Sequence, residues 1–159
     1  MNNPSFRQLL KRPIELLAFG FGSGLSPRAP GTIGTLAAIP LYILLSQSSL
    51  LNYSLLVVVA ATAGIYICGR TSRELGVRDH QGIVWDEFVG YWLAMWGMPF
   101  NWYWPLLGFV IFRAFDIAKP WPISWCDRNI HGGFGIMFDD ILAGAVTCGI
   151  LHLLQYWFW

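Results

Sequence analysis

The chain has 159 residues, which is long enough for one domain with a core and short for two. Charged residues make up only 12% of it, against about one quarter in ordinary soluble proteins, while hydrophobic residues make up 55%. The net charge is +1 and the basic residues are scattered, which excludes the clustered basic surface of a nucleic-acid-binding protein. We therefore expect a single membrane domain over residues 1–159, with the lipid bilayer and not nucleic acid as its surroundings.

Five apolar runs predict the helices of this domain. They cover residues 32–45, 50–69, 88–98, 105–115 and 141–159. Several of them are shorter than the roughly 20 residues that a straight membrane span needs. The sequence therefore predicts an all-α fold, a compact helical integral-membrane bundle with short or broken spans.

The connections between these runs alternate in charge. Residues 46–49 and 99–104 are short and uncharged, whereas the N-terminal segment and residues 70–87 and 116–140 carry most of the charged residues. With five crossings, the tendency of basic segments to stay in the cytoplasm places all charged segments on the cytoplasmic side. Segments distant in the sequence are then expected to form one active site at that face.

A loop rich in Gly, Ser, Thr and Pro precedes the first apolar helix, with the sequence GFGSGLSPRAPGTIGTL over residues 20–36. Such a loop can present backbone N–H groups and a helix N-terminus to a phosphate, and Arg28 can add a planar charged clamp. Arg28 and Thr32 are thus its phosphate-binding candidates. The loop matches neither the P-loop nor the dinucleotide-binding pattern, so a plain turn before a helix is the alternative.

Acidic residues stand in pairs near the starts of two apolar helices. Asp79, Asp86 and Glu87 precede one helix, and Asp139 and Asp140 stand at the mouth of the last run. Carboxylate oxygens are hard ligands that suit Mg²⁺. Helix capping explains one acid of a pair, but not an adjacent second acid so close to hydrocarbon. The two pairs, converging on one or two metal ions, would form a phosphoryl-transfer site.

A third charged segment places Arg113, Asp116 and Lys119 at intervals of three residues, so they share one face if the segment is helical. One interpretation is a structural ion-pair ladder. In the other, Lys119, which precedes Pro120 at a helix end, reaches a phosphate oxygen, while Asp116 binds metal or orients water.

Other phosphatase and metal chemistries lack the required spacing. His80, His131 and His152 do not share a metal-ligand spacing, so the sequence predicts no zinc site. Arg128 follows Cys126 by two residues, instead of at the longer spacing of a cysteine-phosphatase loop. Direct attack by metal-activated water is therefore the expected reaction.

Four segments, SGLSPRAPGTIGTL, HQGIVWDEFVG, FDIAKPWPI and GGFGIMFDDILAG, together resemble the phosphatidylglycerophosphatase A family over residues 18–145. The resemblance implies a mainly helical, Mg²⁺-dependent enzyme of the bacterial inner membrane. It also implies hydrolysis of phosphatidylglycerophosphate to phosphatidylglycerol and inorganic phosphate in phospholipid biosynthesis. The acidic positions matched to the family are Asp79, Asp86, Glu87, Asp116, Asp139 and Asp140, and the phosphate-binding positions are Arg28, Arg113 and Lys119.

Two other classes of function compete with this one. A small membrane cation carrier would need carboxylates near the middle of the bilayer, whereas here they flank the apolar runs. A non-catalytic membrane subunit would not need paired acids beside a Gly-rich turn. Alanine at Asp86 or Asp139 separates these classes, because only an enzyme would lose catalysis.

Overall fold

The computed structural model describes residues 4–77 and 80–158, and these residues contain helices and no strand. This confirms the all-α prediction for the described part of the chain. The elements in chain order are α1 (Phe6–Leu9), α2 (Pro13–Ala18), the 3₁₀ segment η1 (Gly20–Leu25), α3 (Pro30–Leu45), α4 (Leu50–Leu75), α5 (Trp85–Ala94), α6 (Tyr103–Ala118), α7 (Ile123–Asn129) and α8 (Gly132–Phe158).

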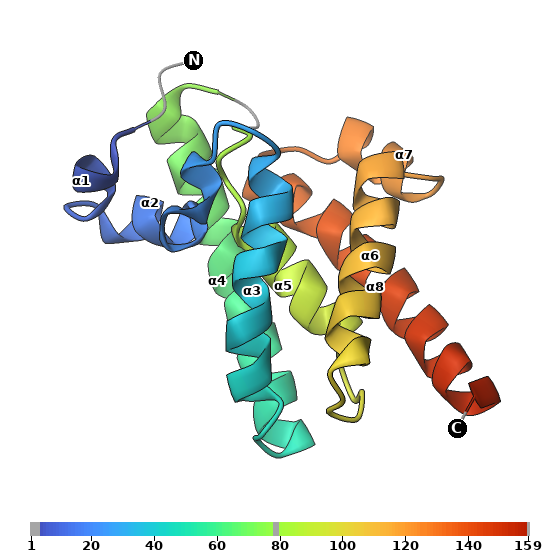
Figure 1. The fold of residues 1–159 in the computed structure, drawn as a ribbon. Coiled ribbons are helices and arrows are strands. Elements are labelled where there is room, and N and C mark those ends of the chain that lie inside the picture. Colours follow the sequence, from blue (N-terminus) through green and yellow to red (C-terminus); the bar gives the residue numbers. More distant parts are fainter. Residues whose placement is uncertain (1–3, 78–79, 159) are drawn as a thin grey trace.

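The short helix α5 lies in the middle of the bundle, where α3, α4, α6 and α8 pack around it (Figure 1). Its side chains are almost all buried, among them Phe88, Tyr91 and Trp92. Glycines let α5 and α8 approach closely, because a Cβ atom at Gly144 would overlap the backbone of Gly90. This contact fixes the middle of α5 beside the middle of α8.

Charged and uncharged connections lie at opposite ends of the bundle, as the charge pattern predicts (Figure 1). The connections after α3 and α5 are at the lower end in that view. The N-terminal helices, residues 80–84 and α7 lie toward the upper end. Polar segments from distant parts of the sequence are thereby brought to one place.

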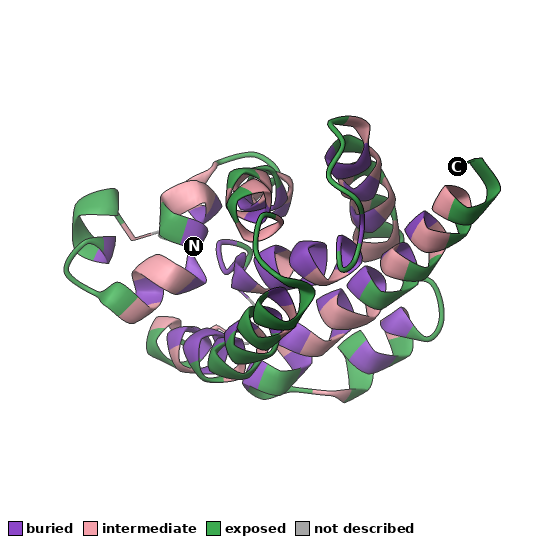
Figure 2. Ribbon diagram, turned by 90° about the horizontal axis from the view of Figure 1, so that it is seen from below, coloured by how far each residue is buried: buried purple, intermediate pink, exposed green. Residues whose placement is uncertain are grey.

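Two of the described helices, α4 with 26 residues and α8 with 27, are long and apolar enough to cross a membrane. Only 28% of the most apolar 18-residue stretch of α4 is buried, and the helix exposes Leu51, Leu55, Val58 and Val59. Figure 2 shows buried residues on the inward sides of the helices and exposed ones outside. These exposed apolar residues are consistent with a membrane protein.

The predicted start of the last helix is wrong, because α8 begins at Gly132 and not at residue 141. Asp139 and Asp140 therefore lie two turns inside the helix instead of at its mouth. Gly133 packs directly against the backbone of Ile65 and Gly69 on α4, where any side chain would overlap. Gly133 thus serves helix packing, whereas Gly132 has a positive φ of 73° and nothing within 4 Å of an added Cβ atom.

Helix capping does not explain the acidic pair at the start of α5. The N-cap of α5 is Val84, so Asp86 and Glu87 both lie within the first turn of the helix. Negative charge there interacts favourably with the positive end of the helix dipole, but neither side chain caps the helix.

Candidate active site

A cavity of about 480 Å³ lies at the charged end of the bundle, between the start of α3, the start of α5, the end of α6, α7 and the first turns of α8. Six of the chain's nine acidic residues line it, whereas two of the described Lys and Arg residues do. Negative charges held this close in a partly buried site repel one another unless a cation joins them. The lining charges are Asp86, Glu87, Asp116, Asp127, Asp139 and Asp140, with Arg113 and Lys119.

Three of these acids form a compact cluster. Asp86, Glu87 and Asp140 each offer one carboxylate oxygen, and the three oxygens lie within 4.8 Å of one another. The second oxygen of Glu87, Oε2, is buried and has no hydrogen-bond partner among the described residues. Such a set of convergent, incompletely satisfied oxygens fits a hard divalent cation such as Mg²⁺.

Glu87 lies outside α4 and α8, the two described helices that are long and apolar enough to cross a membrane. Its surroundings disfavour its charged form. Burial is the largest cause and repulsion by Asp140 and Asp116 adds to it, so that the pKa of Glu87 is raised to about 8. The guanidinium of Arg113, with Nη1 3.7 Å from Glu87 Oε1, opposes this shift. A divalent cation at the cluster would favour the charged carboxylate much more strongly.

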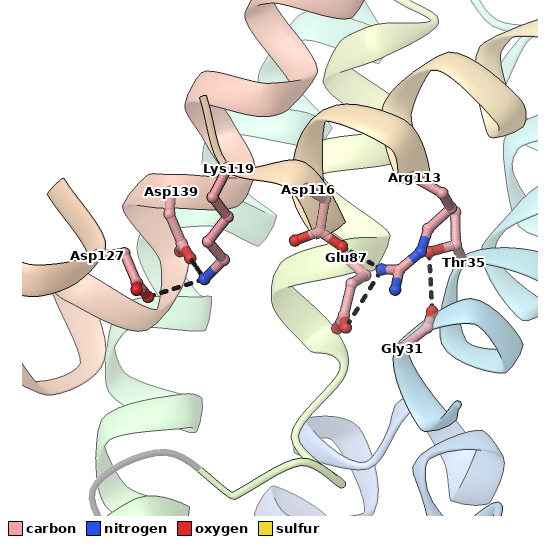
Figure 3. Close-up of polar contacts among 8 residues, drawn as sticks. All are labelled: Gly31, Thr35, Glu87, Arg113, Asp116, Lys119, Asp127 and Asp139. Carbon is pink, nitrogen blue, oxygen red and sulfur yellow. Dashed lines mark hydrogen bonds and ion pairs between the residues drawn. The ribbon is translucent and has the colours of Figure 1, made fainter. Parts of the chain in front are cut away.

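Arg113 and Asp116 lie one turn apart near the end of α6 and form an ion pair (Figure 3). Their predicted placement on one helix face is thereby confirmed. Arg113 also faces Glu87 on α5, so it links the two helices at the edge of the acidic cluster. Its Nε is buried without a hydrogen-bond partner among the described residues, which leaves the guanidinium a further donor.

Lys119 does not continue this ladder, because α6 ends at Ala118 and Lys119 has a left-handed backbone, with φ of 40°. Its side chain turns toward α7 and α8, where Nζ lies 2.6 Å from Asp139 Oδ2 and 2.8 Å from Asp127 Oδ1 (Figure 3). Burial opposes the charged form of Lys119, but the two carboxylates outweigh it and raise its pKa. Lys119 therefore stays positively charged, and in Figure 3 Asp116 and Glu87 lie between it and Arg113.

The first turn of α3 forms another wall of the cavity through Ala29, Pro30 and Gly31. Pro30 occupies the first helical position, where its missing N–H costs nothing. Gly31 lies against Glu87 and Arg113, and a Cβ atom there would overlap Glu87 Oε1 and lie 3.1 Å from Arg113 Nη1. The helix start, with its free backbone N–H groups, can thus approach an anion in the cavity.

Comparison with known proteins decides the family. The family model described as phosphatidylglycerophosphatase A matches residues 16–155. The chain belongs to the phosphatidylglycerophosphatase A family. It is 51% identical over 151 residues to the phosphatidylglycerophosphatase A of Escherichia coli (strain K12), covering 94% of this chain and 88% of the relative. It is 44% identical to that of Haemophilus influenzae, with 98% and 97% covered. No solved structure shows a comparable match.

Family membership confirms the resemblance inferred from the four segments and the prediction of an enzyme of the phosphatase class. For this family member, the structure shows how those segments meet. Each of the four segments lines the same cavity. The second, third and fourth do so with charged side chains, among them Glu87, Asp116 and Asp139, whereas the first does so with uncharged residues such as Gly31.

Two of the described residues that the sequence predicts for the site are not among those that line the cavity. Arg28 is exposed, immediately before the wall residue Ala29, and Thr32 is half-buried, immediately after Gly31. Asp79 lies outside the described residues. The roles of these residues in binding metal or phosphate stay predictions.

Asp127 is a cavity residue that the sequence did not single out. It is a lone acid on the short helix α7, without the adjacent acid that marks the other candidates. The only sequence signal is its place in the charged segment 116–140. Its relevance follows from the backbone turn at Lys119, which directs the ammonium group toward α7.

Proposed function

We propose that the chain is a Mg²⁺-dependent phosphatase that hydrolyses phosphatidylglycerophosphate to phosphatidylglycerol and inorganic phosphate in phospholipid biosynthesis. The observation that carries the proposal is the cluster of Asp86, Glu87 and Asp140 in a cavity with a large excess of carboxylates. The names of the relatives from E. coli and H. influenzae support the choice of substrate.

Asp86, Glu87 and Asp140 are the residues that would hold Mg²⁺, with Asp139 close by on α8. The bound ion would supply charge neutralisation on the phosphate and a more acidic water molecule. The carboxylates fix the position of this charge, and their burial keeps it away from bulk water, where electrostatic interactions are weaker.

Lys119 and Arg113 would bind the phosphate oxygens from two sides. Both are held in place by carboxylates, Lys119 by Asp127 and Asp139, and Arg113 by Asp116. An incoming phosphate can share these donors, because an ammonium has three N–H groups and a guanidinium five. In the reaction, water forms a new P–O bond, the bond between phosphorus and the glycerol oxygen breaks, and the glycerol oxygen takes up a proton.

The proposal places the chain in the bacterial inner membrane as a multi-pass protein with its cavity at the cytoplasmic face. Support comes from the exposed apolar sides of α4 and α8 and from the uncharged connections at the end opposite the cavity. A lipid phosphate keeps its acyl chains in the bilayer and its phosphate at the interface. A cavity at one end of the bundle suits such a substrate.

Removal of Mg²⁺ is expected to stop phosphate release and to lower the unfolding temperature. Mg²⁺ at 100 times its dissociation constant would stabilise the folded chain by about 2.7 kcal/mol. The measurement is phosphate release by the purified chain from phosphatidylglycerophosphate in detergent, with Mg²⁺, with EDTA, and with Mg²⁺ restored after EDTA. Equal release in all three conditions would contradict a metal-dependent reaction; absence of release from folded, Mg²⁺-supplied protein would contradict the phosphatase proposal and favour the carrier or subunit.

A further inference from the structure

The helix α7 separates the cavity from the outer surface of the bundle. Ile123 and Cys126 are buried and hold it against the bundle, and Asp127 contacts Lys119 inside the cavity. Trp125 and Arg128, three residues apart on the helix, share a different face and are exposed. One short helix thus has a side toward the cavity and a side toward the surroundings.

Large aromatic side chains are exposed next to this part of the cavity. Trp121, just before α7, has 81% of its surface exposed, and Trp125 on α7 and Phe134 on α8 are also exposed. The ring of Phe134 stacks on that of Phe138, with centroids 5.1 Å apart. Indole rings, with an apolar body and one N–H group, favour the boundary between membrane and water. We refer to Trp121, Trp125 and Phe134 as the aromatic rim.

Three isoleucines from the same part of the chain as the aromatic rim line the cavity. They are Ile117 of α6, Ile130 between α7 and α8, and Ile136 of α8. Ile117 lines the cavity and is also 69% exposed, so it marks the edge at which the cavity meets the outer surface. The cavity thus combines a carboxylate-rich lining with apolar residues, one of which also reaches the outer surface.

An exposed apolar stripe leads along α6 to the same edge. Leu106, Val110 and Ile117 are all exposed and, from their spacing, lie on one face of the helix. These residues start near the end of the bundle opposite the cavity and reach Ile117, which lines the cavity and stands four residues before Trp121. Leu106 and Val110 thus present apolar surface toward the cavity end of α6, where Arg113 separates them from Ile117.

We propose that the aromatic rim sits in the interfacial layer of the bilayer and is the side by which a lipid phosphate enters the cavity laterally, with its acyl chains still in the membrane. This inference rests on the proposed function and deepens it. The occupant is the bilayer surface: the exposed apolar residues of α6 and the exposed aromatic rim favour lipid over a protein partner, and Arg128, on the same face of α7 as Trp125, suits anionic headgroups.

The test compares a long-chain substrate in a bilayer with a soluble one. The full chain, reconstituted in vesicles of phosphatidylethanolamine and phosphatidylglycerol, is assayed with long-chain phosphatidylglycerophosphate in the same vesicles. The same preparation is assayed with a short-chain analogue below its micelle concentration. We expect the double variant Trp121→Ala/Trp125→Ala to lose about tenfold or more in kcat/KM for the long-chain lipid, since each tenfold corresponds to about 1.4 kcal/mol. Its kcat/KM for the short-chain analogue should stay within about twofold.

The matched control is Trp102→Ala. Trp102 is 73% exposed in the connection before α6, at the end opposite the cavity, so it tests membrane anchoring without affecting the rim. It should retain both activities, and Trp121→Tyr/Trp125→Tyr should recover most of the long-chain activity. Suppose that the wild type is active. If the double variant then keeps its kcat/KM for the long-chain lipid, or loses kcat/KM equally for both substrates, this inference alone is overturned. A folded wild type inactive on both substrates would overturn the proposed function and this inference with it.

Discussion

Replacement of Asp140 by Asn is expected to lower phosphate release by about 10³-fold or more. Asp140 supplies one of three carboxylate oxygens within 4.8 Å of one another, and an amide is a weaker, neutral ligand of similar shape. The same change removes one charge from a crowded acidic cluster, so without Mg²⁺ the unfolding temperature should stay the same or rise. The measurement is phosphate release together with the unfolding temperature, each with and without Mg²⁺.

Glu74→Gln is the matched control for this substitution. Glu74→Gln also replaces an acid by its amide. The Glu74 side chain lies on α4, where it pairs with Arg70 at the surface, and it does not line the cavity. It should retain activity and the stabilisation by Mg²⁺. An Asp140→Asn variant that retained both would show that Mg²⁺, if required, is bound elsewhere.

The hydrophobic pattern predicted the class of fold because apolar residues in this chain gather in long runs. The runs at residues 50–69 and 105–115 lie within α4 and α6. Helix starts were harder to predict where glycine is frequent. A Gly-rich segment is compatible with a turn or with close helix packing, and only the position of α4 beside Gly133 decides between them.

The paired acids could be predicted as a site because adjacent charges near an apolar run are costly without a function. The arrangement of the basic groups could not. Arg113 and Lys119 look equivalent in the sequence, but the left-handed residue at the end of α6 sends Lys119 to Asp127 and Asp139 while Arg113 stays with Asp116. A single backbone angle thus separates the two phosphate-binding candidates.

Gly31→Ala is expected to lower phosphate release by about 10²-fold, although Gly31 carries no chemical group. A methyl group there would overlap Glu87 Oε1 and press on Arg113, so these two side chains would have to leave the positions that they hold at the acidic cluster. Overpacking of this kind costs about 1–3 kcal/mol of stability. The measurement is phosphate release and the free energy of unfolding, with Mg²⁺ present.

Gly149→Ala provides the comparison, because Gly149 lies on α8 with nothing within 4 Å of an added Cβ atom. Alanine favours a helix over glycine by up to about 1 kcal/mol, so this variant should be as active as the wild type and at least as stable. Equal activities of Gly31→Ala and Gly149→Ala would mean that the start of α3 can move away from Glu87 without consequence. Loss of phosphate release in Gly31→Ala alone would instead show that catalysis requires the close approach of α3 to the acidic cluster. Gly31 permits this approach because it has no side chain.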